Sequence, residues 1–174
     1  HQFIEDVRKV IADEGVFILE VEYIGDILAN IQFERFYLDR IFYYSLTSLS
    51  KLFAGHGMYV SDVEKIEPHG GSLRVFVRKK NQSTSLISDS VKKLLKEEKI
   101  SLNVFKLKEF KDLISIYVSA FRDKLVEYKK AGLKVAGYSA PARVATICNY
   151  RNIDSSLIDF IVDDSPLKQN RFSP

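Results

Sequence analysis

Apolar residues follow two periods along the first half of the chain. A one-sided helical pattern covers residues 3–11 and stops before Gly15, and residues 16–23 form an apolar run typical of a buried strand. Leucines repeat at helical spacing over residues 45–54, directly after Ser45, whose hydroxyl suits a helix N-cap. These patterns predict a helix, a strand and a second, capped helix.

Two further runs, 58–66 and 72–79, show partial alternation of apolar and polar residues. They flank the sequence EPHGG, which is rich in residues that turns require. This combination predicts a hairpin. Helix, strand, helix and hairpin together indicate an α/β protein.

The second half begins with a polar loop at 81–85 and a modest helix over 86–98. A much longer helix follows and ends near Gly132. Its apolar stripe keeps one face for about six turns, and we expect this stripe to be core rather than a cofactor site. The stripe consists of Leu107, Phe110, Ile114, Tyr117, Phe121, Leu125 and Tyr128.

A strand–loop–helix–strand unit closes the chain, with strands predicted at 133–138 and 157–164 and a short helix over 142–150. This order is half of a dinucleotide-binding fold, in which a helix N-terminus can hold a phosphate. Asp163 follows the second strand, where an acid that binds a ribose would be expected. The loop lacks the spaced glycines of that motif, so an α/β unit without a nucleotide fits equally well.

Composition narrows the class of protein. The chain has 174 residues, of which 46% are hydrophobic and 28% charged, so it is neither a disordered tail nor a membrane protein. The net charge of +3 comes with no dense basic cluster, so we expect neither nucleic acid nor a membrane as partner. No signal peptide is visible, and a start at His1 within a helical pattern favours a fragment of a longer protein.

Cysteine and histidine usage adds two expectations. Cys148 is the single cysteine, so no internal disulfide can form and a reducing, cytoplasmic location is expected. The three histidines and this cysteine lack the spacing of a zinc site, so no metal is expected.

Four segments resemble one family in order along nearly the whole chain. They are EYIGDIL (22–28), FYLDRIFYYSLTSLSKLFAGHG (36–57), HGGSLRVFV (69–77), and VAGYSAPARVATICNY with FIVDDSPLKQNRF near the end. They resemble the C-terminal half of the S-adenosylmethionine-dependent sugar C-methyltransferases. These enzymes methylate a nucleotide-linked deoxysugar at carbon, in deoxysugar biosynthesis.

The resemblance implies a fold and two domains. Residues 1–80 would be the C-terminal remnant of a class I methyltransferase domain, with 58–79 as its last two strands. Residues 81–174 would be a Rossmann-like C-terminal domain, joined through the long helix. The chain lacks the family's glycine-rich loop and its N-terminal zinc-binding cysteines. The S-adenosylmethionine site would therefore lie mostly outside this chain, and the fragment alone is expected to be inactive.

The resemblance also places a catalytic motif on Tyr37, Asp39 and Arg40. Carbon methylation needs a base that removes a proton beside a carbonyl, and a group that stabilises the resulting enolate. Arg40 stands where the family has its presumed histidine base, and an arginine stays protonated at neutral pH. Arg40 could instead stabilise the enolate or bind phosphate, and ordinary packing roles for this segment remain an alternative.

Two further groups are implied to bind the nucleotide diphosphate-sugar substrate. The first is the turn with His69, Gly70, Gly71, Ser72 and Arg74, in which the Ser72 hydroxyl would act if it faces outward; a plain hairpin turn is the alternative. The second comprises Tyr138, Arg143, Lys168 and Arg171. Here the chain departs from the family, because Ser139 replaces a glycine, Arg143 a lysine and Val144 another glycine, which weakens the case for phosphate at this loop.

Three functions remain open at this point. The first is the substrate half of a sugar C-methyltransferase. The second is a non-catalytic relative that binds a nucleotide sugar or serves as a scaffold. The third is a methyltransferase with another acceptor, in which Tyr37 or His69 is the base. Exposed apolar edges would also favour a homodimer.

Overall fold

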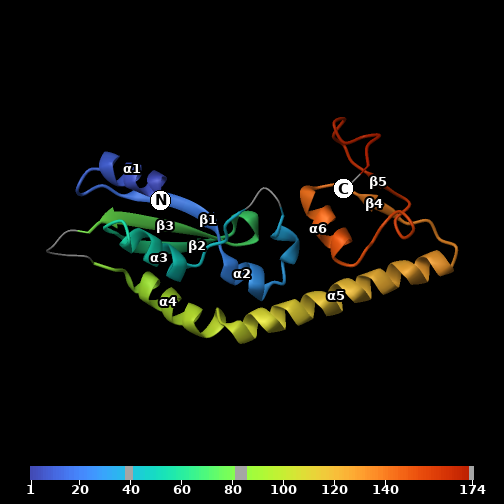
Figure 1. Ribbon diagram of the computed structural model, residues 1–174, viewed down its shortest axis with the longest axis horizontal. Helices are drawn as coiled ribbons and strands as arrows, with labels where there is room; N and C mark the ends of the chain where they lie inside the picture. The colour runs from blue at the N-terminus through green and yellow to red at the C-terminus, as the bar shows by residue number, and fades with distance from the viewer. Residues whose placement is uncertain (38–40, 81–85, 173–174) are drawn as a thin grey trace. The chain divides into compact units, whose positions relative to one another are not determined.

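The computed structural model describes residues 1–37, 41–80 and 86–172. The chain forms a mixed α/β structure with two small sheets (Figure 1). It divides into two compact units, one of residues 1–30 and 42–107 and one of residues 31–41 and 108–174. This division differs from the predicted domain boundary at 80/81, because helix α4 (Asp89–Ser101) contributes to the core of the first unit.

The first unit is built on a three-stranded antiparallel sheet in the order β1-β3-β2. Its strands are β1 (Phe17–Glu22), β2 (Met58–Ile66) and β3 (Ser72–Lys79), so the predicted strand and the predicted hairpin are confirmed. The register slips between Val60 and Asp62 in a bulge. Because of the bulge, Val60 and Val63 both reach the core although they are three residues apart.

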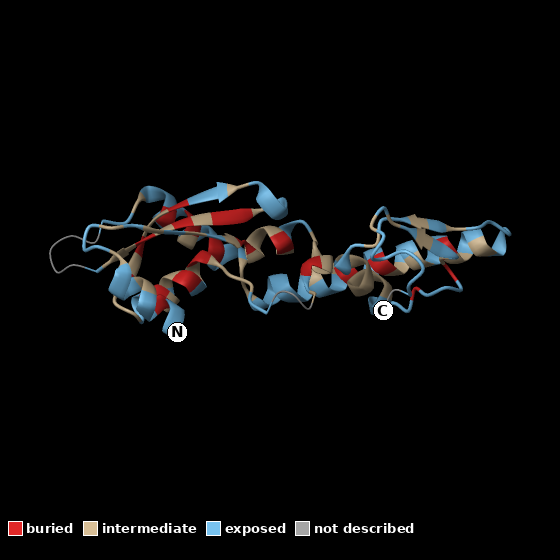
Figure 2. Cartoon of the chain, turned by 90° about the horizontal axis from the view of Figure 1, so that it is seen from above, coloured by how far each residue is buried: buried red, intermediate tan, exposed pale blue. Residues whose placement is uncertain are grey.

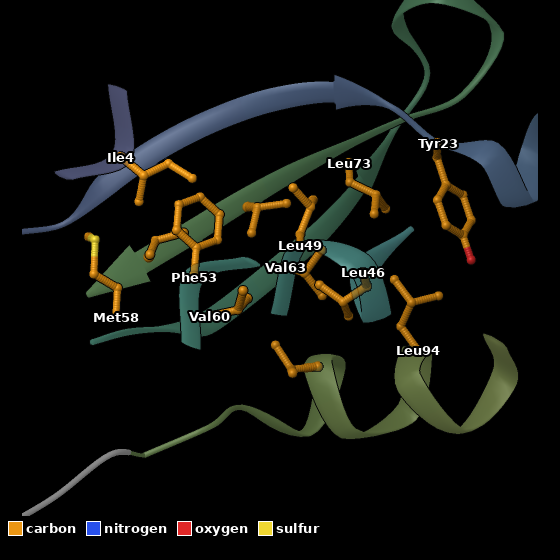
Figure 3. Close-up of a cluster of buried hydrophobic side chains, with 13 residues drawn as sticks. Ile4, Tyr23, Leu46, Leu49, Phe53, Met58, Val60, Val63, Leu73 and Leu94 are labelled. Atoms are coloured by element: carbon orange, nitrogen blue, oxygen red, sulfur yellow. The ribbon is translucent and has the colours of Figure 1, made fainter. Parts of the chain in front are cut away.

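Helices cover one face of this sheet and supply much of its core. They are α1 (Gln2–Val10), α3 (Leu46–Ala54) and α4, while the six-residue α2 (Ile24–Ala29) follows β1. Figure 3 shows leucine and phenylalanine side chains of α3 packed against the strands. Figure 2 shows the buried residues of this unit gathered where the sheet and its helices meet. Helix α1 ends at Val10 rather than at Gly15, because Ile11 is extended.

The N-terminus of α3 is fully capped. Ser45 and Ser48 form a reciprocal capping box at 3.0 Å, which confirms the predicted N-cap. The first two amides, of Leu46 and Thr47, donate to the carboxylate of Glu98 at 2.6 and 2.7 Å, and the Thr47 hydroxyl donates to it at 2.5 Å. Glu98 lies on α4 and is only 2% exposed. It satisfies the amide groups that every helix N-terminus leaves unpaired.

The second unit contains the 3-10 helix η1 (Phe33–Arg35), most of α5 (Val104–Lys130), β4 (Ala136–Tyr138), α6 (Ala142–Tyr150) and β5 (Phe160–Val162). Strands β4 and β5 pair in parallel, as the predicted strand–loop–helix–strand unit requires. They are shorter than the predicted runs, because only three residue pairs join them. None of the described helices is both long and apolar enough to cross a membrane.

The predicted stripe of α5 is only partly core. Two stripe residues, Ile114 and Leu125, are buried, together with Val118, which the predicted stripe did not include. They pack with Ile153 and Leu157 of the same unit. The remaining stripe residues are less buried: Phe110 lies at the edge of this core, and the others are exposed, namely Leu107, Tyr117, Phe121 and Tyr128. The helix is apolar over more than one face, and periodicity alone could not tell which face the neighbouring elements cover.

We expect Glu98→Gln to lower the free energy of unfolding by about 2 kcal/mol, because a buried carboxylate that accepts three hydrogen bonds is replaced by an amide that cannot accept all of them. Urea unfolding followed by circular dichroism measures this. Glu97→Gln, on the exposed side of the same helix, is the control and should change stability by less than about 0.5 kcal/mol. Equal effects of the two substitutions would contradict the capping role of Glu98.

Candidate functional site

The turn between β2 and β3 is the most specialised backbone of the first unit. His69, Gly70 and Gly71 have φ angles of +58°, +74° and +127°. A Cβ atom at Gly71 would lie 2.4 Å from Oδ2 of Asp26, so only glycine fits there. The Gly71 carbonyl accepts a hydrogen bond from the Tyr23 amide at 3.2 Å. The turn is therefore held tightly against the end of β1 and the start of α2.

Charged groups of two elements and the ring of Tyr23 meet beside this turn. The Lys65 ammonium, on β2, lies 3.7 Å from the Asp26 carboxylate on α2 and 5.0 Å from the centre of the Tyr23 ring. Figure 3 shows Tyr23 directing its hydroxyl toward the side where α4 lies. Burial, and next the Glu98 carboxylate, raise the pKa of Tyr23, so the phenol stays protonated and can donate to Glu98.

A cavity of about 440 Å³ opens at the same place. Its walls include Asp26, Asn30, Lys65, Glu67, Gly70 and Gly71. Two carboxylates and one ammonium give these walls a net negative charge. They offer carboxylate and amide acceptors and an ammonium donor, which suits a neutral polyhydroxy ligand better than a phosphate.

Two of the predicted turn residues are engaged within the protein. Ser72 is 2% exposed, and its hydroxyl donates to the Pro68 carbonyl at 2.9 Å, so the outward-facing hydroxyl on which its predicted role depended is not present. Arg74 contacts Glu20 at 2.7 Å and Glu64 at 3.2 Å on the two neighbouring strands, and Glu20 is the main cause of its raised pKa. His69 and Gly70 are exposed, and Gly70 and Gly71 line the cavity.

The second unit carries the other predicted binding residues around the loop after β4. Tyr138 is exposed, with its hydroxyl 3.5 Å from Asp164, and Arg143 is half-buried in the first turn of α6. Lys168 donates to Asp163 at 3.2 Å, and Arg171 is exposed. Ser139 has a φ of +70°, a conformation that the glycine of the family would adopt more easily.

The carboxylate of Asp163 lies against the loop between β4 and α6. It accepts hydrogen bonds from the amides of Ala140 at 2.7 Å and Ser165 at 2.9 Å, besides the one from Lys168. The Ala140 amide, then the Ser165 amide and Lys168, lower the pKa of Asp163 to about 2. The loop thus has an anion of its own beside it, whose negative charge disfavours an incoming phosphate. The expected ribose-binding acid instead stabilises the loop.

The predicted catalytic segment is described only in part. Tyr37 belongs to the second unit, is half-buried, and donates its amide to the Arg35 carbonyl at 3.1 Å. Asp39 and Arg40 lie outside the described residues, so their catalytic roles stay predictions. Within the described ranges there is no group of three or more histidine, cysteine, aspartate or glutamate residues able to hold a metal ion.

A second hollow, of about 420 Å³, lies at the C-terminal end of α6. Arg122 and Arg151 line it together with Asp123 and Tyr150. Asp154, whose pKa is lowered mainly by hydrogen bonds from Ser156 and slightly by Arg122, lies nearby. Because carboxylates balance the guanidinium groups and a helix C-terminus presents carbonyl oxygens, this hollow does not favour an anion.

The comparisons with known proteins agree with this architecture. Residues 67–174 match the family of the C-methyltransferase C-terminal domain. The whole chain is also 30% identical over 176 residues to the C-methyltransferase NovU of Streptomyces niveus, of which it covers 42%. The chain belongs to the C-methyltransferase family and contains its C-terminal domain. Enzymes of this family in general use S-adenosylmethionine.

The described residues do not fit an S-adenosylmethionine site. The glycine turn at 67–71 leads into an antiparallel strand, not into a helix N-terminus, and the loop before α6 already holds the Asp163 carboxylate. Of the residues that the sequence missed, Asp26 and Lys65 form the cavity beside the turn. Their separation in sequence left no local pattern by which they could have been found.

The depressed pKa of Asp163 predicts an acid-dependent loss of stability. The charged form is stabilised in the folded state, so its contribution is present above the unfolded pKa near 4 and is lost as the pH falls toward 2. Asp163→Asn should therefore be less stable than the native chain at pH 6, with the difference shrinking between pH 4 and pH 2. Urea unfolding at several pH values measures this, with Asp164→Asn as the control. A difference that does not change with pH would contradict the role assigned to the carboxylate.

Proposed function

We propose that this chain is the acceptor-binding part of an S-adenosylmethionine-dependent C-methyltransferase that acts on a nucleotide-linked deoxysugar. The observation that carries this proposal is the cavity beside the Gly70–Gly71 turn, in a chain of the C-methyltransferase family. The chain spans less than half of its relative NovU, and we propose that the methyl donor is held by parts of the whole enzyme that this chain does not include.

The cavity suits the sugar of such an acceptor. The carboxylates of Asp26 and Glu67 and the amide of Asn30 can accept hydrogen bonds from sugar hydroxyls, and Lys65 can donate to a hydroxyl or carbonyl oxygen. The two glycines allow the ligand to approach the backbone closely. The excess of acids disfavours the diphosphate at this position.

The chemistry assigned to this chain is proton removal and enolate stabilisation. S-adenosylmethionine supplies an electrophilic methyl group when it is bound to the whole enzyme. Among the residues aligned with the catalytic motif, the carboxylate of Asp39 is the one that can accept the proton at neutral pH. The Tyr37 hydroxyl can donate to the enolate oxygen, and Arg40 can offset its charge.

Calorimetric titration with a panel of nucleoside diphosphate hexoses tests the acceptor site. We expect binding to the native chain, and a roughly 10- to 100-fold weaker affinity for Lys65→Gln, because a charged hydrogen bond to a ligand contributes about 1.5–3 kcal/mol. Lys51→Gln, an exposed position on α3, is the control and should bind like the native chain. S-adenosylmethionine is titrated separately and should not bind.

Two results would contradict this proposal. If no nucleotide sugar binds, the chain does not by itself form the acceptor site. If binding occurs and Lys65→Gln leaves the affinity unchanged, the cavity of the first unit is not the place where the sugar binds.

A non-catalytic nucleotide-sugar-binding or scaffold protein is the second candidate function. Arg40 at the position of the family's histidine, and the carboxylate of Asp163 within the loop, favour it. Arg40→His, introduced into the whole protein with its donor-binding part, distinguishes the two. An enzyme that relies on Asp39 alone as its base should gain about 10²- to 10⁴-fold in methyl transfer when the histidine is introduced, measured with radiolabelled donor. No transfer by either form, with nucleotide-sugar binding retained, would favour the non-catalytic function.

A further inference from the structure

Helix α5 has an apolar face that is not part of the core of the second unit. Its buried side presents Ile114, Val118 and Leu125. On the other side, Ile116 and Tyr117 are 61% and 59% exposed, Leu113 is half-buried and Ala120 is exposed. A monomer gains nothing from exposing two large apolar side chains next to each other on a regular helix.

Charged residues bracket this face in an ordered way. Glu109 lies one turn before Leu113, and Lys124 lies one turn after Ala120. The spacing puts all six residues, from Glu109 to Lys124, on one side of the helix. We refer to Glu109, Leu113, Ile116, Tyr117, Ala120 and Lys124 together as the outer face of α5.

The outer face is complementary to itself in one orientation. Glu109 and Lys124 lie at equal distances, about 11 Å, on either side of the midpoint between Ile116 and Tyr117. Leu113 and Ala120 are also placed symmetrically about this midpoint. When two copies pair antiparallel about it, each Glu109 meets the other copy's Lys124, each Leu113 meets an Ala120, and Ile116 meets Tyr117. A parallel pair would instead place like charges opposite each other.

We propose that a second copy of this chain docks on the outer face of α5, as an antiparallel helix pair with two-fold symmetry. The pairing of a large with a small residue allows the helices to approach, and the two ion pairs fix the register. Both charged residues are already engaged within the chain: Lys124 pairs with Glu127 at 2.9 Å, and Glu109 also has an interaction of its own. Such an exposed pair is weak, so the ammonium can turn to, or share, the partner's Glu109.

The contact between the two helices is short, and its small area limits the expected affinity of the dimer. The outer face covers 16 residues, roughly 24 Å of helix, which buries less than the ~1,200–2,000 Å² of a stable interface. We therefore expect a reversible dimer whose population rises with protein concentration.

Sedimentation velocity of the chain over a concentration series tests the proposal. The native chain should shift from monomer to dimer as the concentration rises. Tyr117→Glu and Glu109→Lys should each weaken dimerisation at least tenfold, and the double reversal Glu109→Lys with Lys124→Glu should restore it. Lys130→Glu, outside the outer face, is the control and should dimerise like the native chain. Circular dichroism checks that each variant is folded.

Three outcomes would overturn the proposal. A monomer at all concentrations would mean that no second copy covers this face. A dimer that persists in Tyr117→Glu would use another surface. A double reversal that stays as weak as Glu109→Lys would exclude the antiparallel register.

Discussion

The buried carboxylate of Glu98 is the group on which the first unit depends. Glu98 caps α3 by accepting hydrogen bonds from two amides and a hydroxyl. Tyr23 directly follows β1, and its carbonyl accepts from the amides of Asp26 and Ile27 in α2. Its own amide donates to the Gly71 carbonyl. A buried charge costs free energy unless it is fully hydrogen-bonded. The Glu98 carboxylate therefore keeps the N-terminus of α3 against α4. The result fixes the glycine turn and the cavity beside it.

The two units treat negative charge in different ways. In the first, the carboxylates of Asp26 and Glu67 border an open cavity, where they can accept hydrogen bonds from a ligand. In the second unit, the carboxylate of Asp163 already accepts hydrogen bonds from two backbone amides, those of Ala140 and Ser165. This difference disfavours phosphate at the loop between β4 and α6, although the N-terminus of a helix follows that loop.

Helix α5 shows how a single amphipathic pattern can serve more than one purpose. Its buried residues provide the core of the second unit, whereas its outer face combines apolar residues with charges of opposite sign at the two ends. The buried face of α5 needs only apolar side chains to pack in the core of the second unit. The outer face also needs charges placed symmetrically along the helix if it is to pair with an identical helix. The distribution of residues on α5 meets both requirements.

The sequence by itself determined the order and type of most elements, including the cap at Ser45, the hairpin at 58–79 and the parallel pair β4 and β5, because these depend on local spacing and turn residues. It also determined the family, since the matching segments follow one another along the chain. It did not predict α2, which is too short for a period, nor which face of α5 is buried. The tertiary structure alone decided that Ser72 faces inward, that Glu98 caps α3, that Asp163 lies against the loop between β4 and α6, and that Asp26 and Lys65 meet at the cavity. Most of these depend on contacts between residues far apart in the chain, for which local periodicity carries no signal. The inward hydroxyl of Ser72, which bonds Pro68 four residues earlier, depends instead on the conformation of the glycine turn.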